Sequence, residues 1–121
     1  MEQLARTFKA LADSTRLRIV NLLLRKPGCV CELQRVLRLP QSLLSRHLAY
    51  LRSAELVADV RQGKRVRYGL RTDGSGVPEL RRFLGRVLPQ QEELRREADA
   101  WGAAHEASEC RRENDGHHKA A

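Results

Sequence analysis

Residues 41–70 read QSLLSRHLAYLRSAELVADVRQGKRVRYGL, and this stretch decides the predicted fold. Its first half has apolar residues at helical spacing and predicts a helix over about residues 41–53, with a polar outer side. Its second half alternates apolar and polar residues around a glycine turn. That alternation predicts a β-hairpin with strands at about residues 56–61 and 65–70.

The residues before this stretch predict three further helices. Apolar periodicity indicates a short helix over about residues 3–12, and a second helix begins at the start signal Asp13-Ser14 and ends at Pro27-Gly28. A third spans about residues 30–37 and is followed by the tight turn RLPQS. A short helix, a tight turn and a longer helix with a polar face form a helix-turn-helix. The basic hairpin after it makes the predicted fold a winged helix.

The residues after the hairpin predict one more long helical segment. It begins near Val77 and extends to Trp101, and Pro89 is expected to kink or divide it. We expect residues 1–101 to form one domain, mostly α with a small β-hairpin, followed by a flexible C-terminal tail of residues 102–121. Aromatic residues are only 4% of the chain, so the core is small and a helical dimer interface is expected to complete it.

The charge is positive and unevenly distributed. The chain has a formal net charge of +8. Residues 1–78 have 15 basic and 6 acidic side chains, a net charge of +9. Residues 79–121 have 8 basic and 9 acidic side chains, a net charge of −1. A basic body favours a polyanionic partner, of which nucleic acid is the simplest, although a solvated basic surface gives the same charge.

The polar side of the helix over residues 41–53 and the hairpin supply the candidate DNA-binding residues. In helix-turn-helix proteins the N-terminal half of the second helix enters the major groove. There glutamine pairs with adenine, arginine with guanine, and serine contacts bases or phosphates. Plain solvent exposure is the alternative for most of these residues, and for His47 it is bracing of the helix. The predicted residues are Gln41, Ser42, Ser45, Arg46 and His47 on the helix and Arg61, Lys64 and Arg65 on the hairpin.

Three cysteines, two of them one residue apart, raise a separate question. No apolar run is long enough to span a membrane, and the amphipathic, acid-containing N-terminus is unlike a signal peptide, so we expect a cytoplasmic protein with reduced thiols. An odd number of cysteines argues against a disulfide framework. The pair Cys29 and Cys31 is then a metal site, a redox switch or part of the core.

Four segments in this order resemble one known family. LADSTRLRIVNLL, CVCEL, SLLSRHLAYLRSAELV and RQGKRVRYGL are similar to the ArsR/SmtB family of metal-sensing winged-helix repressors, and the resemblance covers about residues 4–70. It implies a homodimer, formed through the first and last long helices, that binds double-stranded operator DNA and releases it when an inducer binds.

The Cys29-Val30-Cys31 segment resembles the arsenic-sensing branch of that family. The resemblance implies As(III) or Sb(III) as the inducer, bound by thiolates, with no organic cofactor. A helix N-terminus favours thiolate, and Arg25 and Lys26 lie nearby in the sequence. Residues two apart on a regular helix point about 200° apart. We therefore expect binding to unwind the helix start and to lower DNA affinity.

The chain departs from that branch at its third cysteine. Gln34, Arg35 and Val36 occupy the region where it is expected, and Cys110 is the only other cysteine. The predicted ligands are therefore Cys29, Cys31 and Cys110. Three alternatives stay open: a two-sulfur site completed by water or by the organic group of a methylated arsenical, cadmium or lead as the inducer, and oxidation of the thiols.

Other site types are disfavoured by the sequence. Zinc-sensing relatives use a carboxylate and histidines on the last long helix, and residues 77–102 contain no histidine. His117-His118 is expected to be an inert polar segment or a loose metal site. No phosphate-binding glycine loop or nucleophile–base arrangement is present, so an enzyme is not expected.

Overall fold

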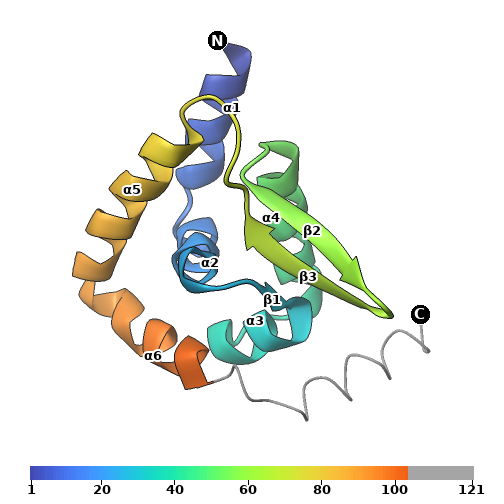
Figure 1. The fold of residues 1–121 in the computed structure, drawn as a ribbon. Coiled ribbons are helices and arrows are strands. Elements are labelled where there is room, and N and C mark those ends of the chain that lie inside the picture. Colours follow the sequence, from blue (N-terminus) through green and yellow to red (C-terminus); the bar gives the residue numbers. More distant parts are fainter. Residues whose placement is uncertain (104–121) are drawn as a thin grey trace.

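The computed structural model describes residues 1–103, so Cys110 and His117-His118 lie outside the described residues (Figure 1). Six α-helices, two short 3₁₀ turns and three strands are found in this part of the chain. In order they are α1 (Glu2–Leu11), α2 (Ser14–Arg25), β1 (Gly28–Cys29), α3 (Val30–Leu37), α4 (Gln41–Ser53), β2 (Val57–Gln62), β3 (Arg65–Leu70), α5 (Val77–Val87), η1 (Leu88–Gln90), η2 (Glu92–Leu94) and α6 (Arg95–Ala103).

The helix-turn-helix consists of α3 and α4, and both helices have the predicted bounds. The α3 helix ends at Arg38, whose φ of 57° is in the left-handed region and whose N–H donates to the Gln34 carbonyl. Pro40 then restricts the chain before α4 begins. Three leucines of α4, at positions 44, 48 and 51, are fully buried, so the opposite side of the helix faces outward.

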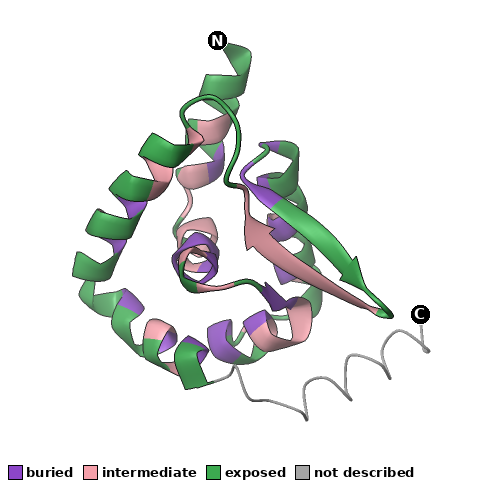
Figure 2. Ribbon diagram, in the orientation of Figure 1, coloured by how far each residue is buried: buried purple, intermediate pink, exposed green. Residues whose placement is uncertain are grey.

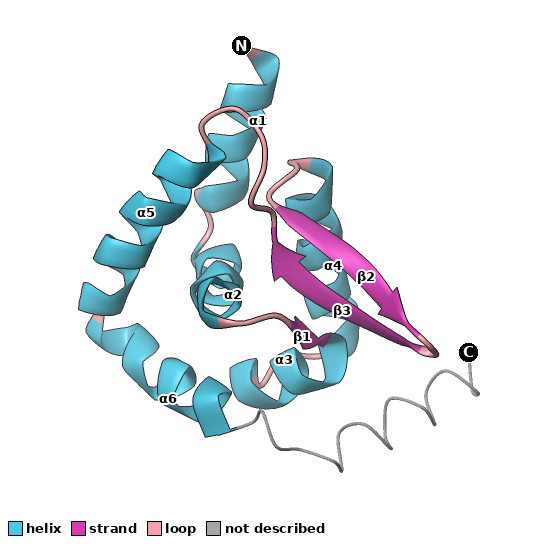
Figure 3. Ribbon diagram, viewed as in Figure 1, coloured by secondary structure: helices cyan, strands magenta, loops and turns pink. Residues whose placement is uncertain are grey.

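The hairpin belongs to a three-stranded antiparallel sheet of order β1-β3-β2 (Figure 3). The predicted strands β2 and β3 pair from Val57↔Leu70 to Gln62↔Arg65, with the turn at Gly63, whose φ is +66°. The third strand was not predicted. It is β1, where Gly28 pairs with Tyr68 and Cys29 pairs with Arg67, so β3 lies between the cysteine segment and β2.

The core surrounds α2, which lies at the centre of the fold (Figure 2). Five consecutive residues of α2, from Ile19 to Leu23, are buried. The other helices pack around it and present exposed residues on their outer sides. The core cluster is mostly leucine, valine and alanine, and Trp101 is its one buried aromatic residue within the described part of the chain.

The C-terminal helical segment is divided, as Pro89 predicts. After α5 the chain makes the 3₁₀ turns η1 and η2 and continues as α6. The change of direction brings α6 beside α3 (Figure 1). Among residues 1–103 no helix has the length and apolar character that crossing a bilayer requires.

Candidate functional site

The N-terminal half of α4 presents polar side chains to solvent. Gln41, Ser42, Ser45 and Arg46 are all exposed. Pro40 supplies no side-chain cap, so the first-turn N–H groups of α4 keep their capacity to bind an anion such as a phosphate. The structure therefore places four of the five predicted helix residues on one accessible surface.

His47 is in a different position, because it is held against the N-terminal helices. Its side chain is 16% exposed. Its Nδ1 lies 3.3 Å from an Arg16 guanidinium nitrogen and 4.0 Å from Asp13 Oδ2. This contact agrees with the bracing alternative for His47.

Arg16 connects three helices at that point. Its Nε donates to the Ala10 carbonyl at 2.7 Å, at the end of α1, and its guanidinium lies 4.1 Å from the ring centroid of Tyr50 on α4. Together with the contact to His47, these interactions fix α4 relative to α1 and α2. The polar side of α4 is thus attached to α1 and α2 by contacts that do not involve the hairpin.

The basic residues of the hairpin gather near its tip. Arg61 and Lys64 are exposed, and Arg65 is half-buried. Figure 1 shows the hairpin extending away from the helices. The Arg52–Asp59 ion pair, at 3.4 Å, joins the end of α4 to β2. The tip and the polar surface of α4 therefore belong to neighbouring elements.

The cysteine pair lies where β1 gives way to α3. Cys29 is 3% exposed and has extended backbone angles, so it is the N-cap of α3 and not part of the helix. Cys31 is in the first turn and is half-buried. The angle of about 200° between residues two apart on a regular helix therefore does not describe this pair, because Cys29 pairs with β3.

Glu32 and Cys29 form a reciprocal capping box. The Cys29 N–H donates to Glu32 Oε1 at 3.0 Å, and the Cys29 side chain accepts from the backbone N–H of Glu32. Glu32 was missed by the sequence reasoning. A cysteine followed three residues later by glutamate has the spacing of a capping box and was a usable signal.

The electrostatics of Cys29 also differ from the expectation. Burial raises the pKa of its thiol, and the Glu32 carboxylate adds to that increase, while the N–H of Glu32 acts in the opposite direction. The helix N-terminus is thus outweighed by desolvation. The Lys26 ammonium lies 4.7 Å from a Trp101 ring centroid, and burial lowers its pKa.

Trp101 closes the other side of the cysteine segment. Its Nε1 donates to the Lys26 carbonyl at 3.2 Å, and the residue is fully buried. A Cβ added to Gly28 would lie 2.3 Å from Trp101 Cη2. The indole therefore packs directly on the residue before Cys29, a contact that sequence alone did not indicate.

The donor set suits a soft, thiophilic ion. Cys29 and Cys31 place two sulfur atoms at one helix start, and Cys31, which is disulfide-bonded in the structure, becomes a donor only after reduction. Within residues 1–103 no group of three His, Cys, Asp or Glu side chains has the arrangement of a metal site. The third predicted ligand, Cys110, lies outside the described residues. The described part of the chain thus contains two of the three predicted ligands.

A buried ion pair joins α6 to the helix-turn-helix. Arg18 Nε donates to Glu97 Oε2 at 2.9 Å, and Arg18 Nη2 donates to the Leu37 carbonyl at 2.7 Å, at the end of α3. The second carboxylate oxygen of Glu97 is buried without a hydrogen-bond partner among the described residues. Arg18 therefore holds α2, α3 and α6 together.

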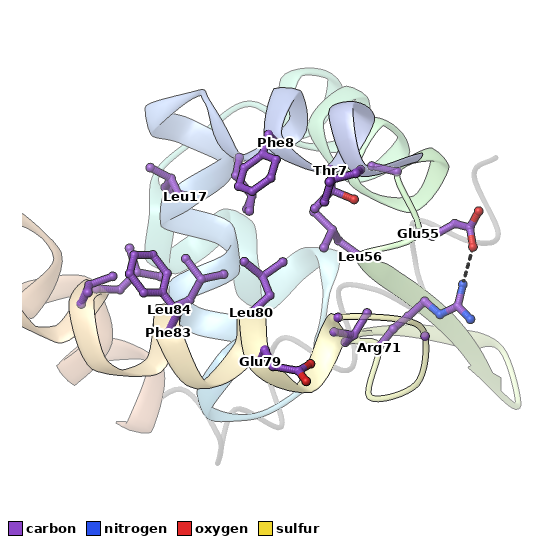
Figure 4. A pocket seen from close by; sticks show the side chains of 18 of the residues that line it. Thr7, Phe8, Leu17, Glu55, Leu56, Arg71, Glu79, Leu80, Phe83 and Leu84 are labelled. Atoms are coloured by element: carbon purple, nitrogen blue, oxygen red, sulfur yellow. Dashed lines mark hydrogen bonds and ion pairs between the residues drawn. The ribbon is translucent and has the colours of Figure 1, made fainter. Parts of the chain in front are cut away.

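An open apolar groove of about 1300 Å³ separates α1 from α5 (Figure 4). Phe8 and Leu17 face Leu80, Phe83 and Leu84 across it. Leu4, Phe8 and Phe83 are 56%, 59% and 51% exposed. These side chains lie on the first and the last long helices.

Comparisons with known proteins give a consistent family. Residues 13–59 match the model of the family described as bacterial regulatory protein, arsR family. The chain is 50% identical over 64 residues to the arsenic resistance transcriptional regulator ArsR1 of Pseudomonas putida, which is 52% of this chain and 50% of that protein. The chain spans about half the length of the first curated relatives it matches.

Solved structures extend the likeness to the fold. HlyU from Vibrio cholerae N16961 superposes with a TM-score of 0.64 at 35% identity, covering 74% of this chain and 95% of that one. The homodimeric winged helix-turn-helix DNA-binding domain of Mb0332 from Mycobacterium bovis, described as a possible ArsR-family regulator, gives a TM-score of 0.63 at 30% identity, with coverages of 74% and 81%. The predicted winged helix-turn-helix class is confirmed.

Proposed function

Because the chain belongs to the arsR family of bacterial regulatory proteins, we propose that it is a transcriptional repressor that binds operator DNA in the cytoplasm. The supporting observation is the exposed polar half of α4 beside a basic hairpin tip. In this fold α4 enters the major groove and the hairpin contacts the adjacent backbone or minor groove. Gln41, Ser42, Ser45 and Arg46 supply base and phosphate contacts, and Arg61, Lys64 and Arg65 supply phosphate contacts.

The salt dependence of DNA binding tests this assignment. Fluorescence anisotropy on DNA from the chain's own upstream region gives the affinity at several salt concentrations. Replacing Lys64 and Arg65 with alanine is expected to reduce the slope of log affinity against log salt by about two units per protomer. Arg82→Ala with Arg86→Ala is the matched control, since both residues are exposed on α5 and do not line the groove. An equal loss in the control would contradict the assignment.

The proposed inducer is trivalent arsenic or antimony, bound through Cys29, Cys31 and Cys110. Support comes from the two cysteines at the start of α3, and from curated relatives named for arsenic resistance. When bound, the ion supplies bonds to thiolate sulfurs. Cys29 then has to give up its role in capping α3, because its sulfur accepts the N–H of Glu32 in the structure. Loss of the cap weakens the first turn of the helix that precedes α4.

The inducer is tested by titrating arsenite into the protein–DNA complex under reducing conditions. Cys29→Ser is the informative variant, since serine caps helices well and removes only the sulfur. We expect arsenite to release wild type and to leave the Cys29→Ser complex intact. Cys110→Ser distinguishes three sulfurs from two. Release by peroxide, cadmium or lead but not by arsenite would replace this inducer with the corresponding alternative.

The proposed assembly is a homodimer whose interface is the groove between α1 and α5. Three large apolar side chains are more than half exposed there, which is costly unless another surface covers them. A second copy presents the same groove about a twofold axis, as an isologous interface requires. The related Mb0332 domain is described as homodimeric.

A further inference from the structure

The segment that bears Cys29 is itself a strand of the sheet that forms the hairpin. Gly28 and Cys29 pair with Tyr68 and Arg67 on β3, the central strand. Arg67 adds a side-chain contact, because its Nη2 donates to the Pro27 carbonyl at 3.2 Å. Pro27 also packs directly against β3, since a Cβ added to Gly69 would lie 3.4 Å from the Cβ of Pro27.

This attachment gives Cys29 a short route to the hairpin tip. Arg67 is two residues from Arg65 and three from Lys64, the proposed phosphate contacts. The route through the helices is longer, because all of α3 and the following turn separate Cys29 from Gln41. The two routes also differ in anchoring. The α4 helix is fixed by Arg16 and by three fully buried leucines, whereas the residues of β3 are all only half-buried.

We propose that Arg67 is a positioning residue that couples the cysteine pair to the hairpin, so that inducer binding releases DNA first through loss of hairpin contacts. This inference rests on the proposed function. Removing Cys29 from its place in the β1–β3 ladder takes Pro27 with it and withdraws the carbonyl that holds the Arg67 guanidinium. The β3 strand then loses support along one edge, and its tip no longer stays at the phosphate backbone.

The test uses the full reduced chain, DNA and arsenite as the probe. For each variant, the DNA affinity without arsenite is divided by the affinity with saturating arsenite. A change that affects both affinities equally cancels in this ratio. Equilibrium dialysis of arsenite checks that each variant still binds it, and thermal melts check that each variant is folded. The variants are Arg67→Ala and Arg67→Lys, with Arg82→Ala as a control that removes an exposed arginine of α5, outside the hairpin.

Two results are expected. Arsenite lowers the salt slope of wild type by about two units per protomer, the contribution of Lys64 and Arg65. The affinity ratio falls by about tenfold in Arg67→Ala, is partly restored in Arg67→Lys, whose ammonium retains one donor for Pro27, and stays at the wild-type value in Arg82→Ala.

Failure of this inference and failure of the proposed inducer give different results. A wild-type affinity ratio in Arg67→Ala, or a salt slope that arsenite does not change in wild type, overturns the coupling through the hairpin and leaves the proposed repressor intact. Absence of arsenite binding and of release in wild type overturns the proposed inducer and this inference together.

Discussion

At Cys29 a single sulfur atom caps α3 and, in the proposed function, binds the inducer. The cap is visible as the reciprocal contact with Glu32. Helix caps contribute about 1 kcal/mol, which is comparable with the coupling free energies of regulated proteins. Competition between capping and binding therefore suffices to link the two events.

Gly28 is the residue whose size is most restricted. We expect Gly28→Ala to destabilise the fold by about 1–3 kcal/mol, because its Cβ would overlap the Trp101 ring and force the indole out. Urea denaturation measures the loss, and a red shift of Trp101 emission reports the displacement. Gly85→Ala is the control: nothing lies within 4 Å of its Cβ on α5, so it should stabilise by about 0.5–1 kcal/mol. Equal effects at both positions would contradict the packing argument.

The carboxylate of Asp13 makes the free energy of unfolding depend on pH. The Arg16 N–H, donated to its carboxylate, holds the pKa of Asp13 below its usual 3.8. A lowered carboxylate pKa adds stability that is complete above the unfolded pKa and is lost as pH falls through the folded pKa. Asp13→Ala is therefore expected to cost about 1 kcal/mol at pH 7, and to cost less as the pH falls below 3.8 through the lower folded pKa of Asp13.

Urea denaturation of both proteins at pH 7 and at pH 3 measures this difference. Asp13→Asn is the matched variant, because asparagine caps a helix without a titrating group. It should keep most of the stability at both values of pH. A cost for Asp13→Ala that is the same at pH 3 and pH 7 would show that the carboxylate charge does not contribute.

At the scale of elements, local signals sufficed for the helices. Leucines at helical spacing, Asp13 and Pro40 predicted α2, α3 and α4 because each signal acts within a few residues. Strand β1 was not predicted, because two residues are too few to show a periodicity and because the residues they pair with lie on β3. For the same reason the sequence showed that Cys29 and Cys31 were candidates but not that one of them is buried in a sheet.

The Arg18–Glu97 pair is another contact between distant parts of the sequence, 79 residues apart. Arg18→Met should destabilise by about 3 kcal/mol, because it leaves a buried carboxylate with only Arg96 at 3.7 Å. The double variant Arg18→Met with Glu97→Leu should recover most of that loss, since no buried charge remains. Denaturation midpoints of the two single variants and the double variant test this. Additive losses would show that the pair is not coupled.

At the scale of the whole molecule, the apolar groove between α1 and α5 is open to solvent in the described part of the chain. Phe83→Asp is expected to prevent dimer formation and to weaken operator binding strongly, because a carboxylate would be buried in the interface. Light scattering measures the mass and anisotropy measures binding. Phe83→Leu keeps the surface apolar and should remain dimeric. A dimeric Phe83→Asp protein would place the interface elsewhere.

The attachment of β1 to β3 also constrains the order of events during synthesis. Pro27 and Arg67 are 40 residues apart, and contacts of long sequence separation form after local ones because closing the intervening loop costs entropy. The helices α2, α3 and α4 can therefore form while β1 is still unpaired. A chain that is still emerging from the ribosome already contains Cys29 and Cys31, but Cys29 takes its native place only after the hairpin has been made. In this fold the candidate sensing segment takes its native place after the helices α2, α3 and α4, and it does so upon the element that is proposed to contact DNA.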